Sequence, residues 1–170
     1  ELRSVGSHKK AKVAMFDGAT VRILGYHKSP VPTYLVQVDG LAYPTEVYLL
    51  RGKQFSLLTK AYPQTDRRAL GQAKFVYYKA RDGLNIPAFL TQPNPQLCGP
   101  GPYATVIHPH GGPWSRDNMG YDQSSWVPLM VSRCMVVLQP QFRGSAGWGK
   151  TLWLAGDGEW GQKMQDDKDD

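Results

Sequence analysis

The sequence is poor in cysteine, because Cys98 and Cys134 are the only two among 170 residues. Cys98 lies in a loop rich in proline and glycine, whereas Cys134 begins an apolar run. Small disulfide-stabilised domains carry many cysteines at close spacing. We therefore expect no disulfide framework in this chain.

Long hydrophobic runs are absent too. A helix that crosses a bilayer needs about 20 consecutive apolar residues, and no stretch of this sequence reaches that length. Residues 1–12 also lack the apolar centre of a signal peptide. We predict no membrane partner. The sequence does not decide between a cytoplasmic and a periplasmic location.

The sequence has no dense basic stripe, although its net charge is +6 and its pI is about 9.3. The basic residues are spread along the chain apart from a short cluster at residues 8–12. A nucleic-acid surface needs a denser patch in a recognisable module, so we expect no nucleic-acid partner. Hydrophobic residues make up 41% of the chain and charged residues 20%, which is ordinary for a packed protein.

The nucleophile motif of α/β-hydrolases, Gly-x-Ser-x-Gly, does not occur in the sequence. The nearest match is residues 143–147, where Arg143 replaces the leading glycine and Ser145 has no obvious partner base. We interpret Ser145 as a turn residue. No complete Ser/Asp/His triad can be assembled from these residues.

Candidate metal ligands are few. His108 and His110 form a His-x-His pair, but a zinc site needs three or four ligands, and the two other histidines belong to the first 30 residues. The acidic tail of residues 159–170 lacks the ligand spacing and central glycine of a calcium loop. It is better interpreted as the acidic start of a helix. We predict no metal and no cofactor.

Short β-like runs separated by turn dipeptides, such as Asp17-Gly18 and Asp39-Gly40, fill the chain up to about residue 70. The runs are residues 12–16, 20–26, 34–38, 46–50 and 55–59. This spacing predicts an antiparallel meander, as found in sandwiches, barrels and propeller blades.

The pattern changes near residues 62–70, and residues 74–79 and 84–90 then predict a hairpin around Arg81-Asp82-Gly83. Two architectures therefore meet at about residue 70.

A strand-helix-strand unit follows the hairpin. Residues 103–108 and 135–138 are apolar runs of the buried-strand type. Between them, Trp126, Leu129 and Met130 share one face of a helix predicted over residues 124–133. This order predicts a βαβ unit in a parallel sheet covered by helices.

Residues 109–114 read Pro-His-Gly-Gly-Pro-Trp and directly follow the strand predicted over residues 103–108. Open α/β sheets bind ligands at the carboxyl ends of their strands. In α/β-hydrolases, an N–H group of such a loop holds the oxyanion of the tetrahedral intermediate. A plain Gly-Pro turn is the alternative interpretation.

Four motifs in order carry a resemblance to a known family. They are Lys-Ala-Arg-Asp-Gly with Ile-Pro-Ala-Phe-Leu (residues 79–90), His-Gly-Gly-Pro-Trp with Arg-Asp (110–117), Gln-Phe-Arg-Gly-Ser-Ala-Gly-Trp-Gly (141–149), and Gly-Glu-Trp-Gly with Met-Gln-Asp-Asp (158–167). Over residues 74–170 the chain resembles the catalytic domain of prolyl oligopeptidase-family serine peptidases. It is most similar to the acylaminoacyl-peptidase and dipeptidyl-aminopeptidase branch.

The resemblance implies an α/β fold class, with residues 71–170 the N-terminal half of an α/β-hydrolase domain and residues 1–70 the last strands of an all-β propeller. It implies that Gly111 and Gly112 supply N–H groups to an oxyanion hole. His110, Trp114 and Arg143 are expected near the active site. The serine, aspartate and histidine of the family lie downstream of residue 170, so we expect the chain to be cut before the nucleophile and to be inactive by itself.

The activity that the resemblance implies is that of a serine-type peptidase, which cleaves oligopeptides or acyl-peptides through an acyl-enzyme. A peptide substrate is then the expected partner, and the full-length enzyme could form a homo-oligomer. The propeller is expected to filter substrates by size. The alternatives are a carboxylesterase on the same hydrolase fold, which usually has a third glycine where Pro113 stands, and a non-catalytic remnant or binding module.

Overall fold

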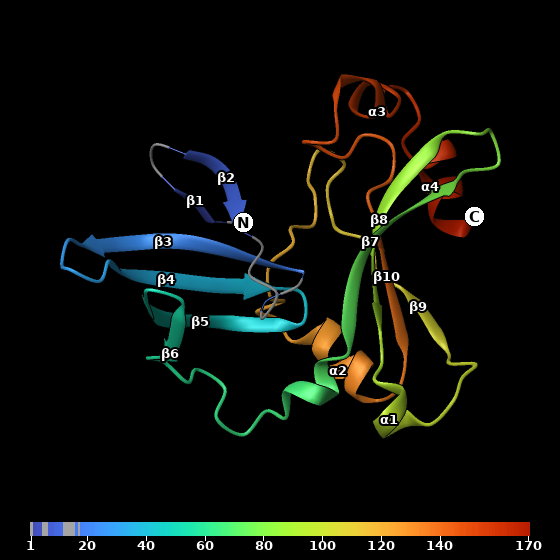
Figure 1. Cartoon of the computed structure of the whole chain (residues 1–170). Helices are drawn as coiled ribbons and strands as arrows, with labels where there is room; N and C mark the ends of the chain where they lie inside the picture. The colour runs from blue at the N-terminus through green and yellow to red at the C-terminus, as the bar shows by residue number, and fades with distance from the viewer. Residues whose placement is uncertain (1, 5–6, 12–15, 17) are drawn as a thin grey trace.

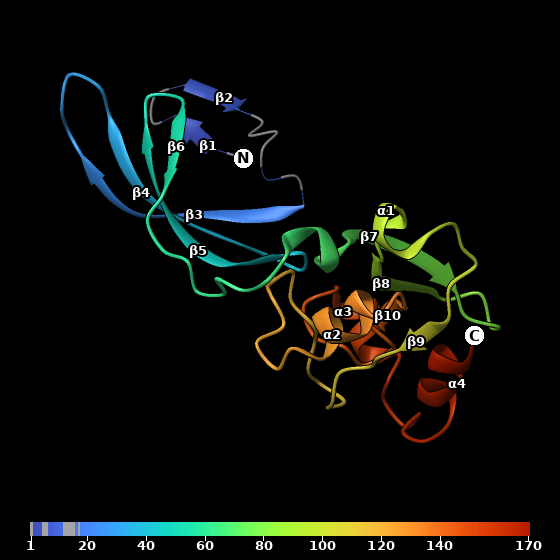
Figure 2. The same cartoon turned by 90° about the horizontal axis from the view of Figure 1, so that it is seen from below.

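The computed structural model describes residues 2–4, 7–11, 16 and 18–170. Two four-stranded sheets dominate it, with a short two-stranded ribbon of β1 (Leu2–Ser4) and β2 (Ser7–Ala11) beside the first (Figure 1). Figure 2 shows the two sheets as separate bodies joined by one connection, which includes the 3₁₀ helix Arg67–Leu70. The boundary that we expect at residues 70–71 falls within this connection.

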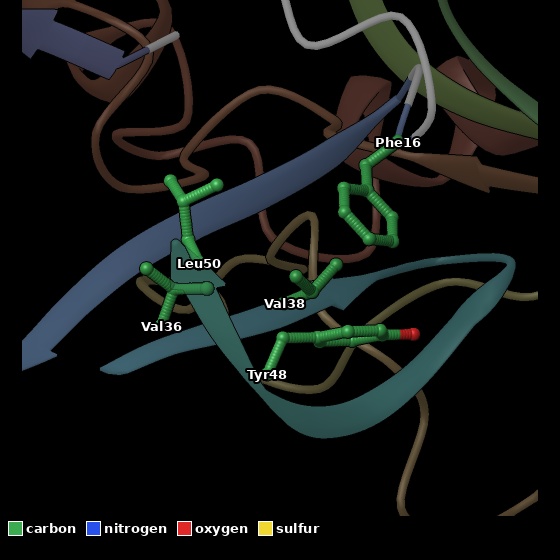
Figure 3. Close-up of a cluster of buried hydrophobic side chains, with 5 residues drawn as sticks. All are labelled: Phe16, Val36, Val38, Tyr48 and Leu50. Atoms are coloured by element: carbon green, nitrogen blue, oxygen red, sulfur yellow. The ribbon is translucent and has the colours of Figure 1, made fainter. Parts of the chain in front are cut away.

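The first sheet is the predicted antiparallel meander, in the order β3-β4-β5-β6. Its strands are β3 (Ala19–His27), β4 (Thr33–Gly40), β5 (Tyr43–Arg51) and β6 (Gln54–Leu57). Alternate residues of β4 and β5 are buried, as expected for strands with one covered face. The core side chains are Phe16, Val36, Val38, Tyr48 and Leu50, which Figure 3 shows gathered together. The strand predicted at residues 12–16 lies outside the described residues except for Phe16.

A buried carboxylate, Glu46 of β5, holds the connection that leaves this sheet. It accepts hydrogen bonds from the Thr59 hydroxyl and from the Ala61 backbone N–H, at 2.5 and 3.0 Å. Arg67 lies 3.9 Å from the same carboxylate. Because Glu46 is only 3% exposed, these partners compensate for the loss of water around its charge.

The second sheet is mixed, in the order β7-β8-β10-β9. Its elements are β7 (Gln72–Lys79), β8 (Asn85–Gln92), α1 (Pro95–Cys98), β9 (Thr105–Ile107), α2 (Trp126–Ser132) and β10 (Val136–Pro140). Strands β7 and β8 form the predicted hairpin, and β9 and β10 are parallel with α2 between them in the chain, which confirms the βαβ unit. Two further helices, α3 (Lys150–Leu154) and α4 (Lys163–Asp169), follow.

Strand β9 corrects one sequence prediction. The strand predicted over residues 103–108 is limited to three residues, and Ile107 is 41% exposed rather than buried. The reason is its position, because β9 is an edge of this sheet and only β10 pairs with it.

Helix α2 corrects a second prediction in part, because, of the three residues on the predicted apolar face, only Met130 packs against the buried cluster. Trp126 and Leu129 are about half exposed, whereas Val127 and Val131 are buried against Val137 of β10. This seven-residue helix has apolar residues on both sides, so its contact with the sheet decides which of them are covered.

No helix within the described ranges is long and apolar enough to span a bilayer.

The two cysteines, which we did not expect to pair, form a disulfide with a Cα–Cα distance of 5.5 Å. Cys98 ends α1, in the segment that leads to β9, and Cys134 lies in the segment that leads to β10. Because β9 and β10 are parallel neighbours, the segments that enter them reach the same end of the sheet. Cysteines with different sequence contexts thereby come together.

Candidate functional site

The Gly-Gly loop, residues 109–114, leaves the carboxyl end of β9 beside the exit of β10. Pairing continues just past β9, where the His108 N–H donates to the Leu138 carbonyl at 2.8 Å. Gly111 and Gly112 are both exposed. Within the described part of the chain, neither of their N–H groups donates a hydrogen bond to another residue, so both can donate to a ligand.

Gly112 is required by the backbone geometry, because its φ of 143° is one that residues with side chains rarely adopt. A Cβ atom there would also lie 3.1 Å from the backbone nitrogens of Trp114 and Ser115. At Gly111 a Cβ atom would meet nothing within 4 Å. The two glycines therefore differ in how well they would tolerate a side chain.

His110 joins the Gly-Gly loop to the loop that follows β10. Its Nε2 lies 2.8 Å from the Ser145 hydroxyl oxygen, and its Nδ1 lies 2.6 Å from the Gly111 carbonyl oxygen. The ring stacks on Phe142, with 4.4 Å between centroids. Because a carbonyl only accepts, Nδ1 of the neutral ring carries the proton and Nε2 accepts the Ser145 hydroxyl proton.

Ser145 was interpreted as a turn residue, and its N–H does close a turn onto the Phe142 carbonyl at 3.0 Å. The expectation that it has no partner base was wrong, because the fold supplies His110. The two residues are 35 positions apart, which is why local sequence context did not reveal the pair. The Ser145 side chain is fully buried.

The segment after the Gly-Gly loop is fixed by a pair of amide hydrogen bonds. Gln141, fully buried at the exit of β10, accepts from the Asp117 N–H at 3.0 Å and donates to its carboxylate at 2.9 Å. The Trp148 indole N–H donates to the same Gln141 oxygen at 3.2 Å. The Ala146 N–H also donates to the Ser115 carbonyl at 2.9 Å. Gln141 and Asp117 were noticed in the sequence only as motif members.

Arg143 lies at the centre of a buried ion network and is 4% exposed. Its guanidinium contacts both oxygens of Asp167 in α4, at 2.7 and 2.9 Å, and both oxygens of Asp82 in the β7–β8 turn, at 2.9 and 3.1 Å. Hydrogen bonds to Asp167, and then to Asp82, raise the pKa of Arg143 although burial opposes this. Through these hydrogen bonds Arg143 holds together the loop after β10, the β7–β8 turn and α4.

The two partners of Arg143 were not predicted as site residues, although both lie in motifs that carried the resemblance. The hydrogen bond from Arg143 lowers the pKa of Asp82. Nearby, the Tyr78 hydroxyl donates to the Asp167 carbonyl, and burial raises the pKa of Tyr78.

Trp114 follows the Gly-Gly loop and lies edge-on to Trp160, with 5.4 Å between ring centroids. Both rings are more than half exposed. They form an aromatic surface next to the loop, and the contact with Trp160 was not predicted.

The two histidines of the His-x-His pair have different surroundings. His110 is engaged by Ser145 and Gly111, whereas the buried Nδ1 of His108 has no hydrogen-bond partner. Among the described residues, no group of three or more His, Cys, Asp or Glu side chains is arranged to hold a metal ion.

Solved peptidase structures share this fold. A puromycin-hydrolyzing peptidase of Mycobacterium tuberculosis matches 83% of the chain with a TM-score of 0.63 and 18% identity, over 24% of its own length. Prolyl oligopeptidase B from Galerina marginata matches 96% of the chain with a TM-score of 0.63 and 18% identity, over 23% of its own length. The fold is thus one that peptidases use.

Two curated proteins of similar sequence are also named as peptidases. Dipeptidyl peptidase family member 6 of Caenorhabditis elegans is 34% identical over 158 residues, which cover 79% of this chain and 21% of that protein. Dipeptidyl aminopeptidase BIII of Pseudoxanthomonas mexicana is 33% identical over 143 residues, which cover 79% of this chain and 20% of that protein. The chain is a homologue of these proteins, and the relatives and the shared fold are consistent with the prolyl oligopeptidase family. It spans about a fifth of their length, and no family model matches it.

Proposed function

We propose that these residues are part of a longer serine peptidase, called the parent protein below, and that they contribute its oxyanion loop. The observation that carries the proposal is a pair of exposed glycines at the carboxyl end of β9, Gly111 and Gly112, whose N–H groups have no hydrogen-bond partner among the described residues. The hydrogen bond between His110 and Ser145 holds this loop against the exit of β10. The serine nucleophile, the base and the orienting acid then come from parts of the parent protein outside this chain.

In the proposed reaction, the serine oxygen attacks the peptide carbonyl carbon while its proton passes to the base. The carbonyl oxygen becomes an oxyanion, to which the Gly112 N–H donates, with Gly111 as the second candidate donor. The C–N bond breaks as the amine leaves with that proton, and water hydrolyses the acyl-enzyme in the same way. Donors fixed before the reaction stabilise the oxyanion without reorganisation.

Residues 1–70 are proposed as the end of a β-propeller that restricts substrates by size, and residues 71–170 as the start of the catalytic domain. The meander β3–β6 supports the first part, and the parallel pair β9–β10 with α2 supports the second. The exposed aromatic pair of Trp114 and Trp160 fits a site that accepts a peptide.

A second candidate is that Ser145 itself is a nucleophile with His110 as its base, since their 2.8 Å separation has the geometry of such a pair. Two observations disfavour it. The side chain of Ser145 has no exposed surface, so a substrate has no access to it. The other nitrogen of His110 faces a carbonyl rather than the carboxylate that orients the base in a triad.

A fluorophosphonate probe, which labels activated serines, separates the two candidates. We expect it to label the parent protein at a serine outside these 170 residues and to leave the isolated chain unlabelled. Ser145→Ala in the parent protein should remain labelled at the same serine. Labelling at Ser145 would favour the second candidate, and an unlabelled parent protein would favour a non-catalytic role. Comparing peptide and ester substrates would distinguish a peptidase from a carboxylesterase.

A further inference from the structure

A second set of contacts joins the β3–β6 sheet to the segment that follows the Gly-Gly loop. We call residues 117–123 the strap, because they lead from that loop toward α2. Near the end of β4, the Oδ1 atom of Asp39 accepts a hydrogen bond from the Tyr121 N–H at 3.0 Å and one from the Thr45 hydroxyl at 2.8 Å. Asp39 thus connects one strand of the meander to the strap.

Side chains support the same contact. Tyr62 packs on Tyr121, with 5.2 Å between ring centroids, and its hydroxyl donates to Gln123 at 2.9 Å. The Gln123 amide in turn donates to the Thr45 hydroxyl at 3.3 Å. Tyr121 is 8% exposed, so this end of the strap is covered.

The approach of Asp39 to the strap is close. At Gly120, a Cβ atom would lie 2.8 Å from Oδ2 of Asp39. Beside this contact lies a cavity of about 290 Å³, lined by Asp39, Gly120 and neighbours from β3, β4 and the strap. Hydrogen bonds to Asp39 and the packing of Tyr62 on Tyr121 therefore hold the strap against the sheet beside this cavity.

The other end of the strap is rigidly held. Asp117 is tied to the buried Gln141 by two hydrogen bonds, only five residues after Gly112. Between them, the Ser115 carbonyl accepts from Ala146. The strap is therefore held at both ends, by Gln141 at Asp117 and by Asp39 at Tyr121, and losing either contact loosens the segment that begins at the Gly-Gly loop.

We propose that Asp39 is a positioning residue that makes the geometry of the oxyanion loop depend on docking of the β3–β6 sheet. The proposal rests on the function proposed above for Gly111 and Gly112. In this role, the contact between Asp39 and Tyr121 orients the strap, and the strap in turn orients the oxyanion loop.

The test uses variants of the parent protein with a chromogenic peptide substrate. Asp39→Ala removes the acceptor for Tyr121 and should lower kcat by roughly 10- to 100-fold with a much smaller change in KM, because small misplacements of catalytic groups are costly. Asp39→Asn keeps an oxygen acceptor and should stay within about 3-fold of the wild type, since only the charge is lost. Gln37→Ala, on the same strand and cavity, is the matched control and should not change kcat.

The rate of fluorophosphonate labelling should fall with kcat in Asp39→Ala, and amide exchange of residues 111–123 should rise while that of β8 stays unchanged. If Asp39→Ala does not fold, Gly120→Ala tests the same contact from the strap side. Wild-type kcat in folded Asp39→Ala or Gly120→Ala overturns the proposal. An inactive, unlabelled wild-type parent protein would instead refute the proposed function.

Discussion

The Nε2 atom of His110 lies 2.8 Å from the hydroxyl oxygen of Ser145. This bond joins the loop after β9 to the loop after β10, so it connects the ends of two parallel strands. Because Ser145 is fully buried and His110 also contacts the Gly111 carbonyl, the bond fixes the conformation of the glycines that we propose as oxyanion donors.

The two glycines provide a matched pair of variants in the parent protein. Gly112→Ala should lower kcat by roughly 10- to 100-fold, because the strained φ and the contacts with Trp114 and Ser115 shift its N–H group. Gly111→Ala should stay within about 3-fold, since its Cβ meets open space. Steady-state kinetics would check both, and equal effects at the two positions would contradict the assignment to Gly112.

Ser145→Ala should lower activity by about 10-fold without abolishing it. The variant removes the hydroxyl that donates to Nε2 of the half-buried His110, which lowers the free energy of unfolding by roughly 1 kcal/mol or more. It also loosens the Gly-Gly loop. Ser115→Ala is the control, because only the Ser115 backbone is bonded to the neighbouring loop. Complete loss of activity and of probe labelling in Ser145→Ala would instead support a nucleophilic Ser145.

The contact between Asp82 and Arg143 should make stability sensitive to acid. The pKa of Asp82 is lowered in the folded protein by its hydrogen bond to Arg143, so its contribution is present above the ordinary aspartate pKa and is lost as the pH falls through the lowered value. Urea unfolding of wild type and Asp82→Asn should therefore differ most near neutral pH. The difference should begin to shrink below about pH 4 and disappear only once the pH is below the lowered pKa of Asp82.

Asp66→Asn is the control for that experiment. The Asp66 pKa is lowered by the neighbouring Arg68, but this pair is exposed and local. We expect Asp66→Asn to change the free energy of unfolding little at any pH, because an exposed pair contributes little to stability. A difference between wild type and Asp82→Asn that does not vary with pH would contradict the prediction for Asp82.

The disulfide should stabilise the β9–β10 region. Cys98 and Cys134 are 36 positions apart, and closing a loop of that size stabilises a fold by about 2–4 kcal/mol. Replacing both by serine should lower the free energy of unfolding accordingly, as measured with denaturant. Reductant should have the same effect on the wild type and none on the double variant, and two free thiols in the oxidised protein would contradict the pairing.

Activity of the parent protein should not depend on a metal at the His108–His110 pair. His110 is engaged by Ser145 and Gly111, which leaves too few ligands for zinc. A chelator should therefore leave kcat unchanged, whereas zinc at one equivalent per chain that is lost in His108→Ala would contradict this.

The elements with strong local patterns were predicted correctly. The alternation in β4 and β5 and the turn around Arg81-Asp82-Gly83 gave the meander and the hairpin, because a period of two and turn residues act over a few neighbours. The strand-helix-strand order gave the parallel pair β9–β10. The prediction for the buried face of α2 was wrong for Trp126 and Leu129, because a short helix with apolar residues on two sides is oriented by the sheet that it covers.

The sequence by itself determined the two kinds of sheet, the position of the Gly-Gly loop after a strand, and the motifs of the family. Only the tertiary structure decided the pairing of His110 with Ser145, the partners of Arg143, the bond between Asp39 and the strap, and the disulfide. Each of these joins residues from 24 to 82 positions apart. Short-range patterns record the preferences of neighbours, whereas such contacts exist only once the folded chain brings distant segments together, as the parallel strands β9 and β10 do for the loops of His110 and Ser145.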